Sequence, residues 1–412
     1  MERAADHVSK ERLWQRLMAM ARHGATRAGG VNRQALSAED IAARKELIDW
    51  GAQLGLTPLG DEAGNVFLRL EGRDPDAAAV MSGSHLDSQP NGGKFDGVYG
   101  VLAALEAVQA IQASGRPCTR SIEIVAWMNE EGSRFAPGMM GSSAYTGAAR
   151  LAQILSVRDG QGTSVATALR EVDTAFPALR RRPLGGPVAA YVEAHIEQGP
   201  LLERAGFSVG VVTGMQGKRT FQVTIKGEPA HAGTSLRAER KDALLAATAA
   251  IQALAGALHD AEDVVKFTVG RLEVKPNAPS VVAGEAIFSI DLRHPDAATL
   301  ADLGDRIAAI CHRAALPCSA DVEELVSAVP LQFPATMRDL VRASAADLRI
   351  RTMDLPSAAG HDARYLNDIC PTAMIFVPCK DGVSHNEAES ATPEDLYDGA
   401  RVLAQTLLAL AE

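Results

Sequence analysis

The pattern of apolar and polar positions predicts alternating strands and helices in the first part of the chain. After two opening helices, short apolar runs predict strands at 65–70, 77–84 and 121–128, and a mostly apolar stretch at about 97–114 predicts a helix between the last two. Strands and helices that alternate in this way form a mixed sheet covered by helices. Functional groups are then expected at the carboxyl ends of the strands.

The pattern changes beyond Gly206. Alternating positions at 207–226 predict strand structure, and an alanine-rich stretch at 243–258 predicts a helix with a buried face. Two strands, a second helix and a closing strand are expected to follow, at 264–274, 284–293, 298–314 and 318–326. A unit of this kind is a compact two-layer α+β module.

The last part of the chain returns to the earlier style, with a helix at 337–347, a buried strand at 372–377 and a terminal helix that begins near Thr392 and Pro393. The region at 151–187, which is rich in arginine and proline, is expected to be less regular. We therefore predict that residues 209–327 are an inserted domain and that residues 1–208 and 328–412 form one discontinuous catalytic domain.

Composition and charge narrow the classes of partner. Acidic residues number 51 against 41 basic ones, and a net charge of −10 argues against nucleic acid or an anionic membrane as a partner. The apolar stretch at 243–258 is too short to cross a bilayer, and the charged amino-terminal helix shows no secretory signal. The five cysteines are irregularly spaced and form no C-x-x-C pair, so we expect free thiols in a cytoplasmic protein.

Four strings of the sequence carry side chains that bind metals. A glycine-rich loop with His85, Asp87 and Asp96 directly follows the strand predicted at 77–84. Three further strings follow in order, at 129–132, 193–199 and 384–387. Imidazole and carboxylate ligands without a thiolate suit Zn, Mn, Co or Ni, and the number of ligands is enough for two divalent ions.

Each of these signals also has a simpler interpretation. A single histidine beside a strand is usually a packed or surface residue, and a Glu-Glu pair is usually a solvated helix start. Glu130 and Glu131, however, end a β-rich run, and adjacent acids at the mouth of a strand point to opposite sides, so one can bind metal while the other handles protons. Asp96 lies between glycines that let the backbone turn, which suits a carboxylate shared by two ions. For His361, support of the site and capping of a helix remain equal alternatives.

With these residues in place, the chain resembles the amidase, hydantoinase and carbamoylase branch of the M20 metallohydrolases over nearly its whole length. The strings that carry the resemblance lie at 83–90, 92–97, 129–135, 195–200, 227–234 and 383–389. The resemblance implies that Asp96 is shared by two ions, that His85 and His195 bind one ion, and that Glu131 and His385 bind the other. Glu130 is then the general base.

The resemblance also implies roles for residues that bind substrate. His231 would reach the site of a neighbouring subunit and stabilise the oxyanion, while Asn277 and Arg293 would hold a substrate carboxylate. The planar guanidinium of Arg293 matches a carboxylate bidentately, although a structural salt bridge is the simpler reading of this residue. Gln198 and the backbone at Gly360 would line the same pocket.

These features together predict a homodimeric, dinuclear metal-dependent amidohydrolase, with the inserted domain serving as dimerisation domain and lid. Its expected substrates are N-carbamoyl-L-amino acids, which are small ureido acids cleaved to the amino acid, carbon dioxide and ammonia. Allantoate amidohydrolase and β-ureidopropionase are the alternatives. The string Gly217-Lys218-Arg219 departs from the Gly-Gln-Arg that allantoate-hydrolysing relatives tend to have, and so favours the first. A silent metal- or peptide-binding homologue is less favoured, because such a protein has no use for the base Glu130.

Overall fold

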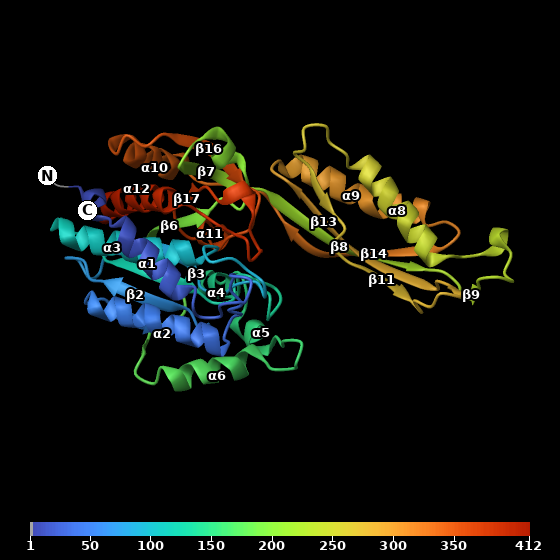
Figure 1. Ribbon diagram of the computed structural model, residues 1–412, viewed down its shortest axis with the longest axis horizontal. Coiled ribbons are helices and arrows are strands. Elements are labelled where there is room, and N and C mark those ends of the chain that lie inside the picture. The colour runs from blue at the N-terminus through green and yellow to red at the C-terminus, as the bar shows by residue number, and fades with distance from the viewer. Residues whose placement is uncertain (1–2) are drawn as a thin grey trace. The chain divides into compact units, whose positions relative to one another are not determined.

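The computed structural model describes residues 3–412, which fall into two compact units. The first consists of Met1–Thr213 and Phe333–Glu412, and the second of Gly214–Gln332. Figure 1 shows both units. In the sequence, the second unit is inserted between the two segments that form the first. The limits predicted from the sequence, 209 and 327, each lie five residues before those of the second unit.

The first unit is built on a large mixed sheet. Its strand order is β15-β7-β17-β6-β3-β4-β2-β1-β5, and β16 pairs with β7. The strands are β1 (Thr57–Gly60), β2 (Val66–Leu70), β3 (Ala79–His85), β4 (Ile122–Trp127), β5 (Arg180–Arg181), β6 (Val188–Ile196), β7 (Val209–Met215), β15 (Leu331–Gln332), β16 (Thr352–Ser357) and β17 (Thr372–Val377). Of these, β15 and the last two residues of β7 fall within the limits of the second unit. The four central strands, β17, β6, β3 and β4, are parallel, so their carboxyl ends lie along one edge of the sheet.

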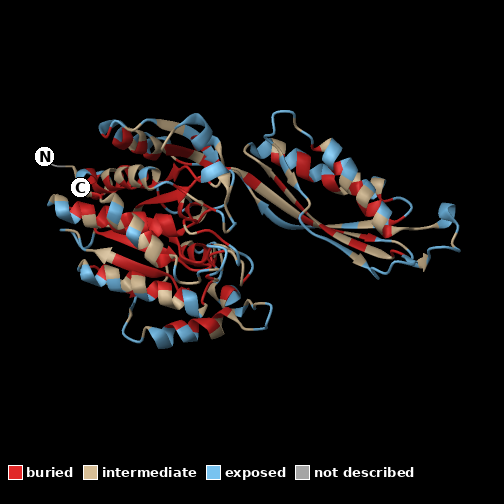
Figure 2. Cartoon of the chain, in the orientation of Figure 1, coloured by how far each residue is buried: buried red, intermediate tan, exposed pale blue. Residues whose placement is uncertain are grey.

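Helices cover this sheet and bury it. The helices of the unit are α1 (Lys10–Met20), α2 (Ala38–Gln53), α3 (Val98–Ser114), α4 (Met140–Thr146), α5 (Leu151–Ser156), α6 (Val165–Ala175), α7 (Leu201–Ala205), α10 (Ala335–Asp347), α11 (Ala363–Leu366) and α12 (Pro393–Ala411). Helix α3 is apolar on nearly all sides because it packs between β3 and α12. Figure 2 shows the buried residues concentrated in these central elements.

The terminal helix illustrates how local sequence sets an element. The hydroxyl of Thr392 accepts the backbone N–H of Asp395 at 3.1 Å, and Pro393 occupies the first turn, where no N–H is required. This start agrees with the prediction. One face of the helix is then buried against the core.

The second unit has two layers. Its sheet has the order β10-β13-β8-β14, with β11 also paired to β13. The strands are β8 (Gly217–Lys226), β10 (Lys266–Thr268), β11 (Leu272–Lys275), β13 (Glu285–His294) and β14 (Ser319–Ala328), and the helices are α8 (Ala243–Ala257) and α9 (Ala297–Ala314). Burial alternates along β13, because one face of the sheet packs against the two helices. The strands β9 (Ala230–His231) and β12 (Val281–Val282) form a separate two-stranded sheet. In the sequence, β9 follows β8 and β12 precedes β13.

Two sequence predictions were wrong. The region at 151–187 contains helices α5 and α6; α6 begins at the N-cap Ser164 and buries one apolar stripe, a helical pattern that the arginines and prolines of the region obscured. The single strand predicted at 264–274 is two short strands, β10 and β11, which both pair with β13 and are separated at Gly270. Among residues 3–412, no helix has the length and apolar character needed to cross a membrane.

Candidate metal centre

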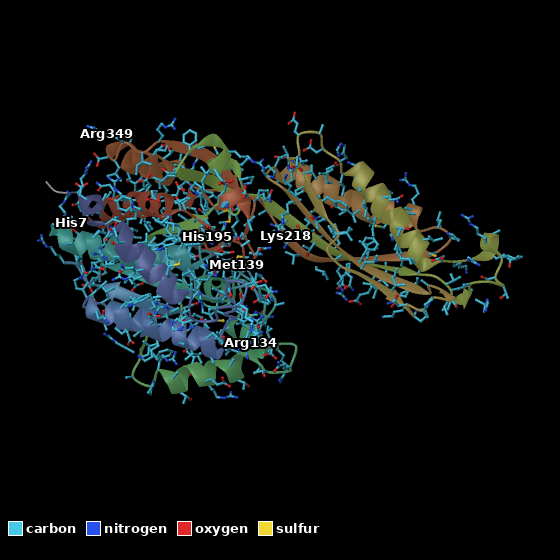
Figure 3. All side chains as sticks on the ribbon, in the orientation of Figure 1. His7, Arg134, Met139, His195, Lys218 and Arg349 are labelled. Atoms are coloured by element: carbon cyan, nitrogen blue, oxygen red, sulfur yellow. The ribbon has the colours of Figure 1, made fainter. Side chains whose placement is uncertain are left out.

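The predicted ligands lie where the four parallel strands end. His85 is the last residue of β3, and His195 lies one residue before the end of β6. Glu131 follows β4, and His385 follows β17. Parallel pairing brings these strand ends together, so side chains that are far apart in the sequence meet inside the first unit, where Figure 3 labels His195.

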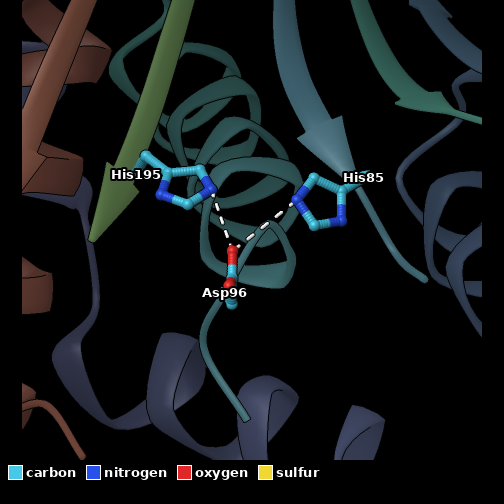
Figure 4. A group of neighbouring side chains, drawn as sticks. All are labelled: His85, Asp96 and His195. Carbon is cyan, nitrogen blue, oxygen red and sulfur yellow. Dashed lines mark ion pairs between the residues drawn. The ribbon is translucent and has the colours of Figure 1, made fainter. Parts of the chain in front are cut away.

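Asp96 lies at the centre of this group. Its Oδ1 is 3.2 Å from Nε2 of His195 and 3.7 Å from Nε2 of His85. Figure 4 shows both rings turned toward this carboxylate from two different strands. All three side chains are buried, which leaves little water to compete for their donor atoms.

The other oxygen of Asp96 faces a second group. Its Oδ2 is 3.3 Å from Nε2 of His385, and the same nitrogen is 3.4 Å from Oε2 of Glu131. In each group, the donor atoms all lie within 4.8 Å of one another. One carboxylate therefore belongs to two groups of potential metal ligands, each completed by two further side chains.

The histidines present the nitrogen that a metal ion requires. Nδ1 of His85 donates to the carbonyl of Asp87 at 2.9 Å, and Nδ1 of His195 donates to the carbonyl of Ile196 at 2.9 Å. Because a carbonyl can only accept, both rings carry a hydrogen on Nδ1, so the neutral form of each ring turns a lone pair on Nε2 inward. Gly97 supports this for His195, since its backbone N–H donates to Nε2 at 3.1 Å. The donor set thus fits a divalent cation.

Gly97 also permits the close packing of the loop. Its φ is +65°, a conformation that side chains disfavour. A Cβ at this position would lie 2.3 Å from Cε1 and Nε2 of His85. The absence of a side chain therefore lets the Asp96 loop approach the histidine ring.

Glu130 and Glu131 approach the centre from two sides, as predicted, but the reason differs from the predicted one. Strand β4 ends at Trp127, and a turn follows in which Asn129 has a φ of +55°. Oε2 of Glu130 is 3.5 Å from Nε2 of His85, whereas Glu131 faces His385. The turn, and not a continued strand, separates the two carboxylates.

Burial and the neighbouring carboxylates of Asp362 and Glu131 raise the pKa of Glu130 well above its usual range. A carboxyl group in such a setting has a high affinity for a proton, which suits a general base. Burial alone would lower the pKa of His195, but the hydrogen bond to Asp96 raises it to about 9. The hydrogen bond to Asp96 likewise raises the pKa of His385 to about 9.

Several residues that support the site were not assigned from the sequence. Asp87 accepts the backbone N–H of Glu130 on Oδ1 and that of Glu131 on Oδ2, both at 3.2 Å, and so fixes the turn. The amide of Gln89 donates to Oε2 of Glu131 at 2.7 Å. Both residues lie in the string that carries His85, which was the available signal.

Gln198, predicted to bind substrate, lies at the centre itself. Its Nε2 donates to Oδ2 of Asp96 at 2.9 Å. Gly360 lies near the side chain of Met139, in the turn before α11. A role for either residue in substrate binding stays a prediction.

His361 packs against a predicted ligand. Its ring centroid is 4.5 Å from that of His195, and its Nε2 lies 2.9 Å from the hydroxyl of Ser357. The N-cap position of α11 belongs to Asp362, so His361 supports His195 and does not cap the helix. His361 and His195 also form a third close group with Glu193.

Glu193 of this third group is held by hydrogen bonds to other residues. Glu193 accepts the hydroxyl of Ser84 at 2.7 Å, the hydroxyl of Tyr191 at 3.2 Å and the backbone N–H of Ala363 at 3.0 Å. Its carboxylate oxygens are therefore satisfied by protein donors. The network ties β6 to β3 and to the start of α11.

The remaining predicted residues belong to the second unit, where His231 lies on the separate β9–β12 pair and Arg293 lies on β13 of the larger sheet. His231 pairs with Val281, and Asn277 lies in the turn just before. Arg293 pairs with Lys218, whereas the opposite end of β13 pairs Glu285 with Lys226. Arg293 lies eight positions after Glu285 along β13, a span of about 26 Å. His231 follows the Lys226 end of β8, at the end of the unit opposite to Arg293.

The two ends differ in chemistry. At one end, Nδ1 of His231 accepts the backbone N–H groups of Gly233 at 3.0 Å and Thr234 at 3.2 Å, so the exposed ring carries its hydrogen on Nε2 and can donate. At the other end, Nε of Arg293 donates to Oδ1 of Asp291 at 2.7 Å. The salt bridge that offered the simpler reading of Arg293 is thus present.

Comparisons with known proteins show the family of the chain. Residues 81–409 match the family model described as peptidase family M20/M25/M40. The chain is 38% identical over 410 residues to an N-carbamoyl-L-amino-acid amidohydrolase of Rhizobium meliloti, covering 98% of this chain and 97% of the relative. It is 35% identical to the allantoate amidohydrolase of Escherichia coli, over 94% and 95% of the two chains.

Solved structures show the same similarity. A crystal structure of a hydantoinase/carbamoylase family amidase from Burkholderia multivorans superimposes with a TM-score of 0.89, at 41% identity and with 98% of each chain covered.

Proposed function

The chain belongs to peptidase family M20/M25/M40, and from this premise we propose that it is a metal-dependent amidohydrolase acting on N-carbamoyl-L-amino acids. It would cleave the bond between the ureido carbon and the amino acid nitrogen. The products are the amino acid and carbamic acid, which breaks down to carbon dioxide and ammonia.

The observation that carries this proposal is the shared carboxylate of Asp96. Each of its oxygens faces a separate group of donors, so the centre is suited to two divalent ions, of Zn, Mn, Co or Ni. His85 and His195 would bind one ion, and Glu131 and His385 the other. When bound, such ions polarise a carbonyl and lower the pKa of water to near neutrality.

Glu130 is the proposed base because it borders the ligands without belonging to either group. Its Oε2 would accept a proton from the attacking water and later return it to the leaving nitrogen. The presence of Glu130 also argues against a protein that binds metal or peptide without turnover, because such a protein has no use for a base.

The substrate residues of the second unit support a dimeric site. A small ureido acid is much shorter than β13, which spans about 26 Å from Glu285 to Arg293, and His231 lies at the Glu285 end. If His231 donates Nε2–H to the oxyanion while Arg293 binds the carboxylate, the two residues come from different copies of the chain. Asn277, at the His231 end, would then act from the same copy as His231.

The second unit also offers a surface for such a dimer. Strand β14 lies at the end of its sheet, and among the described residues no strand pairs with its outer edge. Leu325 and Val326 on this strand are 54% and 43% exposed. An open edge with exposed apolar residues is a ready surface for pairing with a second copy.

A panel of ureido substrates tests the proposal. The purified enzyme, reconstituted with each of the four metals in turn, is assayed for ammonia release from N-carbamoyl-L-methionine, its D-enantiomer, allantoate and 3-ureidopropionate. We expect turnover of the L-carbamoyl amino acid. Turnover of allantoate alone would show that the substrate is wrong while the metal chemistry is right.

A further inference from the structure

Glu389 is a buried carboxylate that touches two of the loops carrying the predicted ligands. It lies four residues after His385 and is 4% exposed. A charged side chain so deeply buried must be held by hydrogen bonds, and those it makes all involve the backbone or side chains of these two loops.

Its first oxygen holds the loop of Asp96. Oε1 accepts the backbone N–H of Phe95 at 2.9 Å and that of Asp96 at 3.1 Å. Two N–H groups aimed at one oxygen fix both the position and the orientation of the peptide that carries the shared carboxylate.

Its second oxygen holds the loop of His385. Oε2 lies 3.0 Å from the hydroxyl of Ser384, which is also 3.1 Å from Oδ2 of Asp96. Ser384 directly precedes His385, so the hydroxyl lies between the two carboxylates and next to the histidine. The same hydroxyl thus ties Asp96 to the loop of His385.

The space around Glu389 is shaped to its carboxyl group. A Cβ on Gly93 would lie 2.0 Å from Cδ and Oε1 of Glu389. The glycine therefore leaves room for the carboxylate directly beneath the Asp96 loop, and both residues belong to the close packing of the centre.

We propose that Glu389 is a positioning residue that sets the place of Asp96 relative to His385, and thereby the spacing between the two predicted metal groups. It does so by hydrogen bonding and not by charge, because it contacts N–H and O–H groups rather than a potential ligand atom. The proposal rests on the metal-binding function proposed above.

The isosteric variant Glu389→Gln can keep all the hydrogen bonds that Glu389 makes. In Glu389→Gln, the remaining oxygen can still accept the N–H groups of Phe95 and Asp96. The new amide can donate to Ser384, whose single hydrogen is then free for Asp96. We therefore expect Glu389→Gln to keep the geometry that Glu389→Ala loses.

The control is a second buried carboxylate. Glu106 is 0% exposed, accepts the backbone N–H of Ser9 at 2.7 Å, and pairs with Arg12 and Arg16. It lies on α3 and contacts none of the predicted ligands in these interactions. Glu106→Ala should lower thermal stability as Glu389→Ala does, but should leave metal binding unchanged.

The experiment measures binding of Zn²⁺ to the metal-free full-length protein by competition with a chelating dye, and the visible spectrum of the Co²⁺ form. We expect Glu389→Ala to weaken binding about 10- to 100-fold and to alter the Co²⁺ spectrum. Glu389→Gln should stay close to the wild type. Gly93→Ala, which pushes on the carboxylate from the other side, should reproduce the loss.

Wild-type affinity in Glu389→Ala, or an equal loss in Glu106→Ala, would overturn the positioning role. If Glu389→Ala does not fold, Gly93→Ala and Glu389→Gln decide the question, since weakened Zn²⁺ binding is expected from the first and wild-type binding from the second. Wild-type binding in Gly93→Ala would then overturn the proposal. Absence of Zn²⁺ binding in the wild type is a different result, because it would refute the proposed function itself.

Discussion

Replacing Gly97 with alanine should damage the metal centre far more than the fold. The substitution adds two penalties that can be separated. The first is backbone strain: a residue with a Cβ at φ +65° and ψ −49° costs about 1–3 kcal/mol. The second is a collision, since the new Cβ would lie 2.3 Å from the ring of His85. To restore ordinary contact, the ring must retreat by about 1 Å.

That retreat is large for a metal ligand, whose distance to the ion is usable within about 0.2 Å. The loss of one aligned imidazole should therefore weaken metal binding by at least about 100-fold, the upper range for changes that act on ligands only indirectly. Gly115→Ala is the matched control. Gly115 has a φ of +66°, but a Cβ there would meet no atom within 4 Å. Its variant should lose only stability, by about 1 kcal/mol.

The assay is Zn²⁺ competition with a chelating dye, combined with thermal unfolding of the metal-free proteins. We expect Gly115→Ala to bind Zn²⁺ like the wild type and Gly97→Ala to bind it poorly, even at temperatures where both are folded. Equal affinities in the two variants would show that His85 is not a ligand, or that its ring moves without consequence.

Three further predictions test other parts of the site. Glu130→Gln should retain the metal ions while kcat falls about 10²- to 10⁴-fold; a variant with unchanged turnover would remove Glu130 as the base. Metal affinity should fall as the pH drops below about 9, because Asp96 raises the pKa of His195 and His385 to about 9 and the ion must displace those protons. Chelator competition at several pH values measures this affinity, and an affinity that does not change with pH would contradict the prediction. Arg293→Lys should raise KM for N-carbamoyl amino acids about tenfold or more with little change in kcat, because a lysine cannot bind a carboxylate through two parallel hydrogen bonds. Steady-state kinetics measure this, and an unchanged KM would show that Arg293 forms only its ion pair with Asp291 and does not bind substrate.

Elements with strong local signals could be predicted from the sequence. Strand β17 occupies 372–377 as expected, because its continuous apolar run lies between Pro371 and Pro378. Helix α12 begins where Thr392 and Pro393 indicate a helix start. The carboxyl ends of the central strands could also be anticipated as the place of the site, since parallel strands align their ends.

The supporting residues could not be assigned in the same way. Asp87, Glu131 and Glu389 all lie in strings with the chemistry of metal ligands. Only the folded loops show that Glu131 faces a histidine, whereas Asp87 and Glu389 accept backbone N–H groups. A carboxylate next to a ligand motif has the same composition in both roles, and the difference depends on contacts between loops far apart in the chain.

The arrangement of those contacts explains why the site needs so many carboxylates. Asp87 holds the turn of Glu130 and Glu131, Glu389 holds the peptide of Asp96, and backbone carbonyls hold the Nδ1 hydrogens of the two buried histidines. Four of the five potential ligands, Asp96, Glu131, His85 and His195, are thus oriented by a partner that does not itself face the centre. Because the orientation comes from the protein, little side-chain ordering remains to oppose metal binding. The shape of the centre therefore depends on the loops after β3, β4 and β17 being held to one another, as much as on the ligands at their tips.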